Sequence, residues 1–205
     1  MRAGAGGAGA SGAVLEPVAW DGLRGGPAGG LDVSGQRLTR AGARLSRLAA
    51  PEVAEAMGWA TTVFTAEAYA IWREVIERAP EKMFPRILER FRAGAQVSAP
   101  DYVAAWRRLE DLRRIWADRA ADFDAVLLPT SPILPPEANR LMTDQEYYVT
   151  ENLLALRNTR IGNLMGLCVL TMPTSQPSCG ISFMAPALAE GRLLRLGAGA
   201  EHALR

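Results

Sequence analysis

The spacing of apolar positions predicts two long helical stretches in the middle of the chain. From about Glu52 to Ala79 apolar residues recur at helical spacing, with an interruption expected near Gly58. Ser98, followed three residues later by an aspartate, is typical of a helix start, because its hydroxyl can accept from an unpaired backbone amide. We therefore predict a long helix after Ser98, with one packed and one solvated face. The expected apolar stripes are Phe64, Ala68, Ile71, Val75 and Ala79 in the first stretch, and Tyr102, Trp106, Leu109, Leu112 and Trp116 in the second.

Three short apolar runs are typical of strands covered on both faces. They are DAVLLP at 124–129, CVLTM at 168–172 and GISFM at 180–184. Thr143 with Glu146 repeats the capping pattern and predicts a helix over 143–158, and the chain is expected to end in a helix over 190–204. Residues 35–41 predict a short helix and 43–49 an exposed strand. This alternation predicts the α/β class, with helices packed on a mixed, largely buried β-sheet.

The first 31 residues differ from the rest in composition. Glycine and alanine dominate them, and large apolar side chains are too few to offset the entropy of ordering the backbone. We therefore predict a flexible head over residues 1–31 and one folded domain over residues 32–205.

Length and charge narrow the class of protein. The chain has 205 residues, is 49% hydrophobic and carries a formal net charge of +1. It is long enough for one buried core, and its charge balance gives no field that attracts nucleic acid or an anionic membrane. No apolar run reaches the length of a membrane span, and the first residues lack the leucine-rich centre of a secretory signal. We predict a soluble, cytoplasmic protein that binds neither nucleic acid nor membranes.

The stretch MPTSQPSCGISF holds a candidate nucleophile, either Ser178 or Cys179. Ser178 does not fit the Gly-x-Ser-x-Gly pattern of hydrolases, since position 176 is glutamine. Cys179 has a single possible imidazole partner in the chain, His202, so a thiol enzyme is the last-ranked alternative. Cys168 lies in an apolar run and favours a buried, unreactive role. With two cysteines and one histidine the usual metal sites cannot be assembled, and we expect no metal and no other cofactor.

Other conspicuous groups favour structural roles. Paired carboxylates such as Asp122 and Asp124 lie beside arginine-rich helices, where surface ion pairing is the simplest interpretation. The tryptophans at 72, 106 and 116 stand at helical spacing among apolar neighbours, and we expect them in the core.

Five motifs occur in a fixed order over the last eighty residues. They are DAVLLPTSP at 124–132, TRIGNLMG at 159–166, VLTMPT at 169–174, GISF at 180–183 and LLRL at 193–196. This order resembles the C-terminal half of an amidase-signature hydrolase, and the likeness extends upstream through residues 92–102 and 40–44. It covers roughly Asp32 to Arg205. The resemblance implies part of an amidase-signature fold.

Members of that family cleave carboxamides with a Ser-cisSer-Lys triad, and the resemblance implies that this triad belongs to the N-terminal half. The closest counterpart here to the family's serine-rich loop, residues 6–12, holds only Ser11. Lys82, the single lysine, comes after that stretch, whereas the family lysine precedes its serines. We assign no catalytic residue and expect no amide hydrolysis by this chain alone.

The resemblance implies a pocket role for Thr159, Asn163 and Gly166, which match the family's Thr and Asn-x-x-Gly elements. The alternative is that these residues only turn the chain between a helix and a strand. The chain departs from the family at Cys168, where proline is usual, and at residues 175–176, where glycine is common.

The leading functional hypothesis is therefore a C-terminal fragment of an amidase that acts on non-peptide carboxamides. It would meet a small-molecule amide only when a missing half completes it. Half of a large sheet would expose a strand edge, so self-association or a partner chain is expected. The alternative is a non-catalytic interaction or regulatory subunit derived from an amidase.

Overall fold

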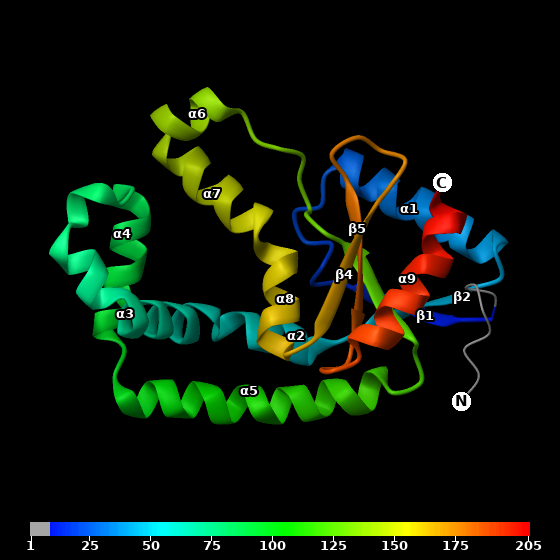
Figure 1. The fold of residues 1–205 in the computed structure, drawn as a ribbon, viewed down its shortest axis with the longest axis horizontal. Helices are drawn as coiled ribbons and strands as arrows, with labels where there is room; N and C mark the ends of the chain where they lie inside the picture. Colours follow the sequence, from blue (N-terminus) through cyan, green and yellow to red (C-terminus); the bar gives the residue numbers. More distant parts are fainter. Residues whose placement is uncertain (1–8) are drawn as a thin grey trace.

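The computed structural model describes residues 9–205, and a five-stranded mixed sheet forms their centre (Figure 1). Its strands are β1 (Ser11–Glu16), β2 (Arg44–Ala49), β3 (Ala125–Pro129), β4 (Cys168–Pro173) and β5 (Gly180–Ala185). They lie in the order β2-β1-β3-β5-β4. β1 pairs in parallel with β2 and β3, whereas β5 is antiparallel to β3 and β4. The predicted α/β class with a mixed sheet is confirmed.

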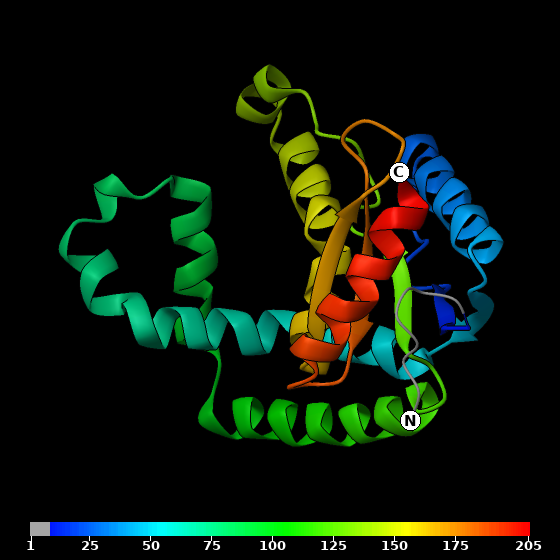
Figure 2. The same cartoon turned by 45° about the vertical axis from the view of Figure 1, so that its right-hand side comes forward.

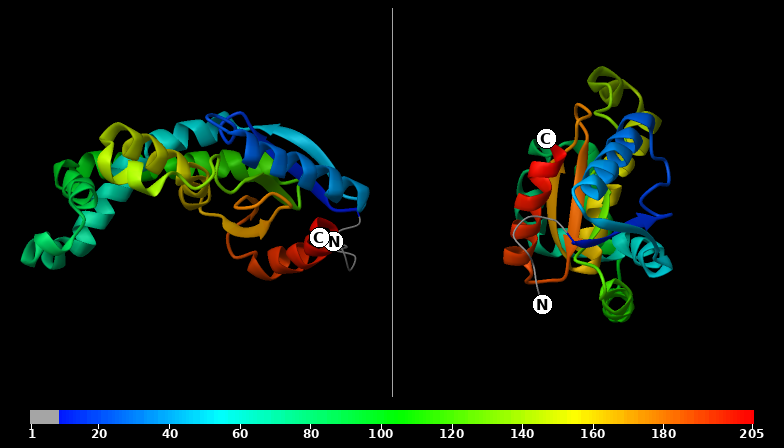
Figure 3. Two further views of the ribbon diagram at one scale, coloured as in Figure 1. Left: turned by 90° about the horizontal axis from the view of Figure 1, so that it is seen from above. Right: turned by 90° about the vertical axis from the view of Figure 1, so that its right-hand side faces the viewer.

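Helices cover both faces of this sheet (Figure 3). They are α1 (Gly25–Arg40), α2 (Pro51–Gly58), α3 (Ala60–Arg78), α4 (Pro85–Arg92), α5 (Ala99–Ala120), α6 (Ala138–Thr143), α7 (Gln145–Ala155), α8 (Arg157–Met165) and α9 (Glu190–Leu204), with short 3-10 helices at Pro80–Lys82 and Ala93–Gln96. α1 and α9 pack on one face, and α2, α5 and α8 on the other. None of the helices within residues 9–205 has the length and apolarity needed to cross a membrane.

β3 and β5 are buried throughout nearly their whole length, as predicted from their continuous apolar runs. The same prediction is wrong for β4, where Val169, Thr171 and Pro173 are exposed, Cys168 and Leu170 are partly buried and Met172 is buried. The reason is position, because β4 is the last strand of the sheet order and no strand among the described residues pairs with its outer edge. Val169 and Thr171 therefore remain exposed.

The prediction of a flexible head over 1–31 is wrong for residues 11–31, while residues 1–8 lie outside the described part. Residues 11–16 form β1 between β2 and β3, and α1 already begins at Gly25. A Cβ atom at Gly12 would lie 2.7 Å from Leu45 Cδ2 and 3.0 Å from Leu127 Cδ1, so this position favours a residue without a side chain. Further along β1, Ala13 and Leu15 are buried in the core.

A helical arm, defined here as residues 60–98, projects away from the sheet (Figures 1 and 2). The predicted break near Gly58 is confirmed, since α2 ends there and α3 begins at Ala60. Because α3 extends beyond the core, Ile71 and Val75 of the expected packed stripe are exposed, while Ile76 of the same half is buried. Ile71 is 71% exposed and Trp72 is 52% exposed. By contrast, Trp116 is buried and Trp106 is partly buried, as expected.

The predicted start of α5 is confirmed, because the Ser98 hydroxyl accepts a hydrogen bond of 3.2 Å from the Asp101 backbone N–H. Ser98→Ala removes this acceptor, and we expect a loss of about 1 kcal/mol in the free energy of unfolding. Urea denaturation followed by circular dichroism measures it. Ser98→Thr keeps both the acceptor and the hydroxyl that donates 2.6 Å to the Asp101 carboxylate, and it should stay close to the wild type, so equal losses in both variants would contradict a capping role.

The start predicted at Thr143 is displaced by one residue. Asp144 caps α7 and accepts 2.9 Å from the Tyr147 N–H, whereas Thr143 ends α6 and donates to the carbonyl of Asn139. Aspartate and threonine are both good capping residues, so the pattern alone does not distinguish neighbours. The predicted single helix over 143–158 is instead α7 followed by α8, with Leu156 between them.

Candidate functional site

The start of α8 is anchored to the end of β3 by one buried side chain. Asn158 is 1% exposed, and its Nδ2 donates 2.7 Å to the carbonyl of Pro129 and 3.3 Å to that of Ala19. A buried amide is tolerated when its donors are satisfied, and these two bonds join three segments distant in sequence. Asn158 therefore fixes the helix above the carboxyl end of β3.

Three hydroxyl groups meet at that end of the sheet, and we call them the hydroxyl cluster: Thr130, Thr171 and Ser182. The Ser182 Oγ lies 2.8 Å from Thr130 Oγ1 and 3.1 Å from Thr171 Oγ1. Thr130 follows β3, and the other two are directly opposed across β4 and β5. A Cβ atom at Gly180 would lie 2.9 Å from Thr130 Oγ1, so the absence of a side chain there lets the hydroxyls approach.

The cluster contains hydroxyl groups without a catalytic partner. Ser182 is 3% exposed, while Thr171 faces solvent at the open edge. Among the described residues the cluster's side-chain hydrogen bonds run only between the three hydroxyls, so no imidazole, amine or carboxylate activates them. A hydroxyl without a base is a weak nucleophile but can donate to, and accept from, a bound polar group.

The residues predicted for a pocket are split between two places. Thr159 and Asn163 lie one turn apart and are exposed on α8, and Thr159 Oγ1 donates 3.0 Å to the carbonyl of Leu156. Gly166 ends α8 in the left-handed conformation at φ 65°, where glycine carries no steric penalty. The alternative interpretation is that these residues only turn the chain between a helix and a strand. At Gly166 that interpretation has a physical basis. A pocket role for the three residues stays a prediction.

Gly166 also borders a pocket of about 340 Å³ at the far end of α8, and neither Thr159 nor Asn163 lines it. Arg113 crosses this pocket wall, where its Nε donates 2.7 Å to the carbonyl of Leu164 and its guanidinium lies 5.0 Å from the Trp106 ring centre. A cation at a helix C-terminus satisfies free carbonyls. Arg113 thus has a structural role that accounts for its position.

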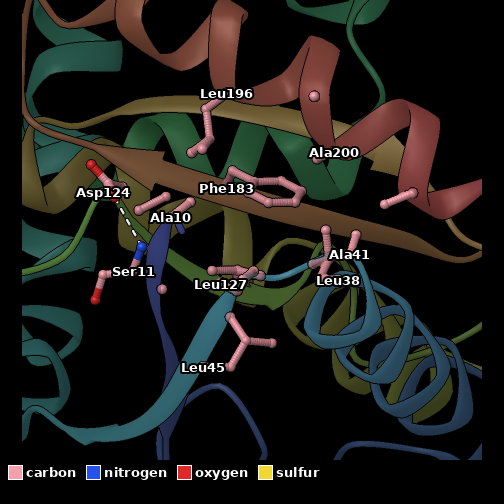
Figure 4. A pocket seen from close by; sticks show the side chains of 15 residues that line it. Ala10, Ser11, Leu38, Ala41, Leu45, Asp124, Leu127, Phe183, Leu196 and Ala200 are labelled. Atoms are coloured by element: carbon pink, nitrogen blue, oxygen red, sulfur yellow. Dashed lines mark hydrogen bonds between the residues drawn. The ribbon is translucent and has the colours of Figure 1, made fainter. Parts of the chain in front are cut away.

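A second cavity lies between the sheet and helices α1 and α9 (Figure 4). It measures about 40 Å³, far below the few hundred Å³ typical of ligand sites, and its wall is mostly apolar. At its rim Asp124 accepts 2.9 Å from the Ser11 N–H and 2.5 Å from Arg192. Burial opposes ionisation, but these two hydrogen bonds hold the pKa of Asp124 below its usual value. Ser11 and Asp124 therefore tie β1 to β3 and α9.

The candidate nucleophiles lie in the connection between β4 and β5, as the sequence indicated. Cys179 is buried, and this burial raises the pKa of its thiol, which is the opposite of an activated thiolate. Ser178 has a positive φ of 60° in the turn. Lys82 is exposed at the end of a 3-10 helix in the helical arm. The geometry gives none of them a catalytic environment.

Sequence reasoning missed Asn158 and the hydroxyl cluster. A signal existed for the cluster, since Thr130 lies in the DAVLLPTSP motif, Thr171 in VLTMPT and Ser182 in GISF. What the sequence lacked was the strand register that places Thr171 opposite Ser182.

Solved structures define the class of this fold. A urea amidolyase of Kluyveromyces lactis superposes with a TM-score of 0.82 at 16% identity, covering 96% of this chain and 12% of that one. A crystal structure described as an amidase gives 0.78 at 20%, covering 97% and 46%. A glutamyl-tRNA(Gln) amidotransferase polypeptide from Thermotoga maritima gives 0.69 at 20%, covering 93% and 41%. The fold is that of amidase-type enzymes.

Sequence comparison gives the family. The sequence model of the family described as Amidase matches residues 28–194. A 2-amino-5-chloromuconic acid deaminase from Comamonas testosteroni is 33% identical over 191 residues, which cover 89% of this chain and 40% of that protein. The chain belongs to the amidase family, and it spans about two fifths of the length of this relative.

Proposed function

We propose that this chain is the C-terminal part of an amidase acting on non-peptide carboxamides, and that it is inactive alone because the Ser-cisSer-Lys triad is missing. One observation carries the proposal: a chain covering 40% of its relative's length holds a hydroxyl cluster without a base. In this proposal Thr159, Asn163 and Gly166 shape the side of the substrate pocket that faces the missing residues. Nucleophile and base come from the remainder of the protein.

Exposed apolar residues are available to contact that remainder. Val149 and Leu153 of α7, and Leu156 directly after it, follow one another at helical spacing and are each at least 40% exposed. Val169 is 42% exposed and belongs to β4, whose outer edge pairs with no strand among the described residues. An apolar stripe and an unpaired strand edge favour coverage by further polypeptide.

The purified 205-residue chain is expected to release no ammonia from benzamide or propionamide above a heat-treated control. Co-expression with an N-terminal amidase segment that carries the serine loop and lysine should restore release. The matched control is the same segment with its nucleophilic serine replaced by alanine, which should give none.

Two results would decide against this function. Ammonia release by the chain alone that is lost in Ser11→Ala or Lys82→Ala would mean that the chain contains its own catalytic groups. Stable association with a partner that lacks the triad would favour a regulatory subunit instead.

A further inference from the structure

Arg86 is held in a defined position between the helical arm and α7. Its guanidinium carbon lies 4.4 Å from the centre of the Tyr148 ring and 5.9 Å from that of Phe84. Its Nη1 donates 2.8 Å to the carbonyl of Leu141. Arginine has five N–H donors, so this one bond leaves others free while the aromatic contacts hold the guanidinium in place.

Two more arginines belong to the same region. Arg90 lies one turn beyond Arg86 on α4, about 6 Å along the helix axis. Arg160 of α8 reaches back to α7, where its Nη2 donates 2.9 Å to the carbonyl of Leu153. Arg86 and Arg160 therefore both contact α7, Arg86 at the Tyr148 ring and Arg160 at the Leu153 carbonyl. Burial lowers the pKa of Arg160, and the positive charge of Arg90 lowers it further. All three arginines are partly buried.

Within residues 9–205 no acidic side chain forms an ion pair with these three arginines. The ion pairs of that part of the chain use other arginines, including Arg92 of the same helix with Glu77. Residues 1–8 contain no aspartate or glutamate. Partial burial of like charges is costly unless an anion offsets it, and guanidinium groups match carboxylates in geometry. The arrangement therefore has the character of an anion site.

We propose that Arg86, Arg90 and Arg160 form a binding site for the carboxylate of a small organic acid, between α4 and the α7–α8 pair. A role of this site in holding the substrate rests on the proposed function. The name of one relative, which contains a carboxylic acid, supports that role. As a binding site it does not require catalysis.

Calorimetric titration of the 205-residue chain with adipate, a flexible dicarboxylate, tests the site without turnover. We expect adipate to bind and adipamide, its neutral diamide, not to bind, with affinity falling as sodium chloride is raised. Arg90→Gln and Arg160→Gln should each weaken binding about tenfold or more, because each removes a charged donor pair. Arg160→Lys should retain more affinity than Arg160→Gln.

Arg107→Gln is the matched control, since Arg107 is exposed on α5 and forms none of the ion pairs described above. It should bind adipate like the wild type, and circular dichroism should show that every variant is folded. Absence of adipate binding, equal binding of adipamide, or unchanged affinity in Arg90→Gln and Arg160→Gln would each overturn the site. Because no step depends on hydrolysis, a failed complementation experiment would leave a positive titration intact.

Discussion

Gly94→Ala is expected to destabilise the protein by roughly 3–5 kcal/mol, among the larger effects of a single methyl group. The 3-10 helix that contains Gly94 crosses α3 so closely that a Cβ atom would lie 1.9 Å from the Thr65 carbonyl oxygen and 2.4 Å from its carbonyl carbon. Both atoms are backbone, so no rotamer change relieves the overlap. The two elements must move apart, which opens the helical arm.

Urea denaturation of the Gly94→Ala variant measures this loss, and hydrogen exchange should show lower protection in residues 60–98. Gly29→Ala is the control, because Gly29 lies within α1 and a Cβ atom there meets no other atom within 4 Å. That change should be neutral or stabilise by up to about 1 kcal/mol, since alanine favours helix more than glycine does. Equal stability of the two variants would contradict the close crossing.

The sequence predicts elements well where the local pattern and the tertiary environment agree. β3 is an example, because an apolar run ended by proline is buried on both faces. α5 is another, because Ser98 caps the helix and the stripe from Leu109 to Trp116 is packed. In both cases the information lies within a few neighbouring residues.

Prediction fails where long-range packing decides. The sequence predicts a flexible segment where β1 lies. The reason for glycine at position 12 is the close approach of Leu45 and Leu127 on the adjacent strands, which the local sequence does not contain. The hydroxyl cluster is equally non-local, since Thr130 and Ser182 are 52 residues apart and meet through strand pairing. The order of the motifs identified the family, and these motifs hold all three hydroxyls, but their order does not predict that the hydroxyls meet.

The second large effect concerns a buried carboxylate. Glu151 of α7 is 2% exposed and pairs with Arg24, which precedes α1, through two hydrogen bonds of 2.8 and 2.6 Å. Arg24→Met should cost about 2–3 kcal/mol, because it leaves a carboxylate without its counter-ion. Arg24 is half-exposed. We therefore expect a loss in the free energy of unfolding at or below the lower end of the range found when a fully buried ion pair is broken.

A double-mutant cycle separates the pair from its surroundings. Glu151→Gln removes the charge but keeps the shape, so it should cost less than Arg24→Met, and Arg24→Met combined with Glu151→Gln should recover part of the loss. Arg47→Met is the control, because Arg47 is 81% exposed and its oxygen contact with Glu16 is 3.4 Å. It should change stability by less than about 0.5 kcal/mol. If Arg24→Met costs no more than Arg47→Met, the bond between Arg24 and Glu151 does not hold α1 and α7 together, and the fixed position of α7 must come from Asn158 and the packing of α8.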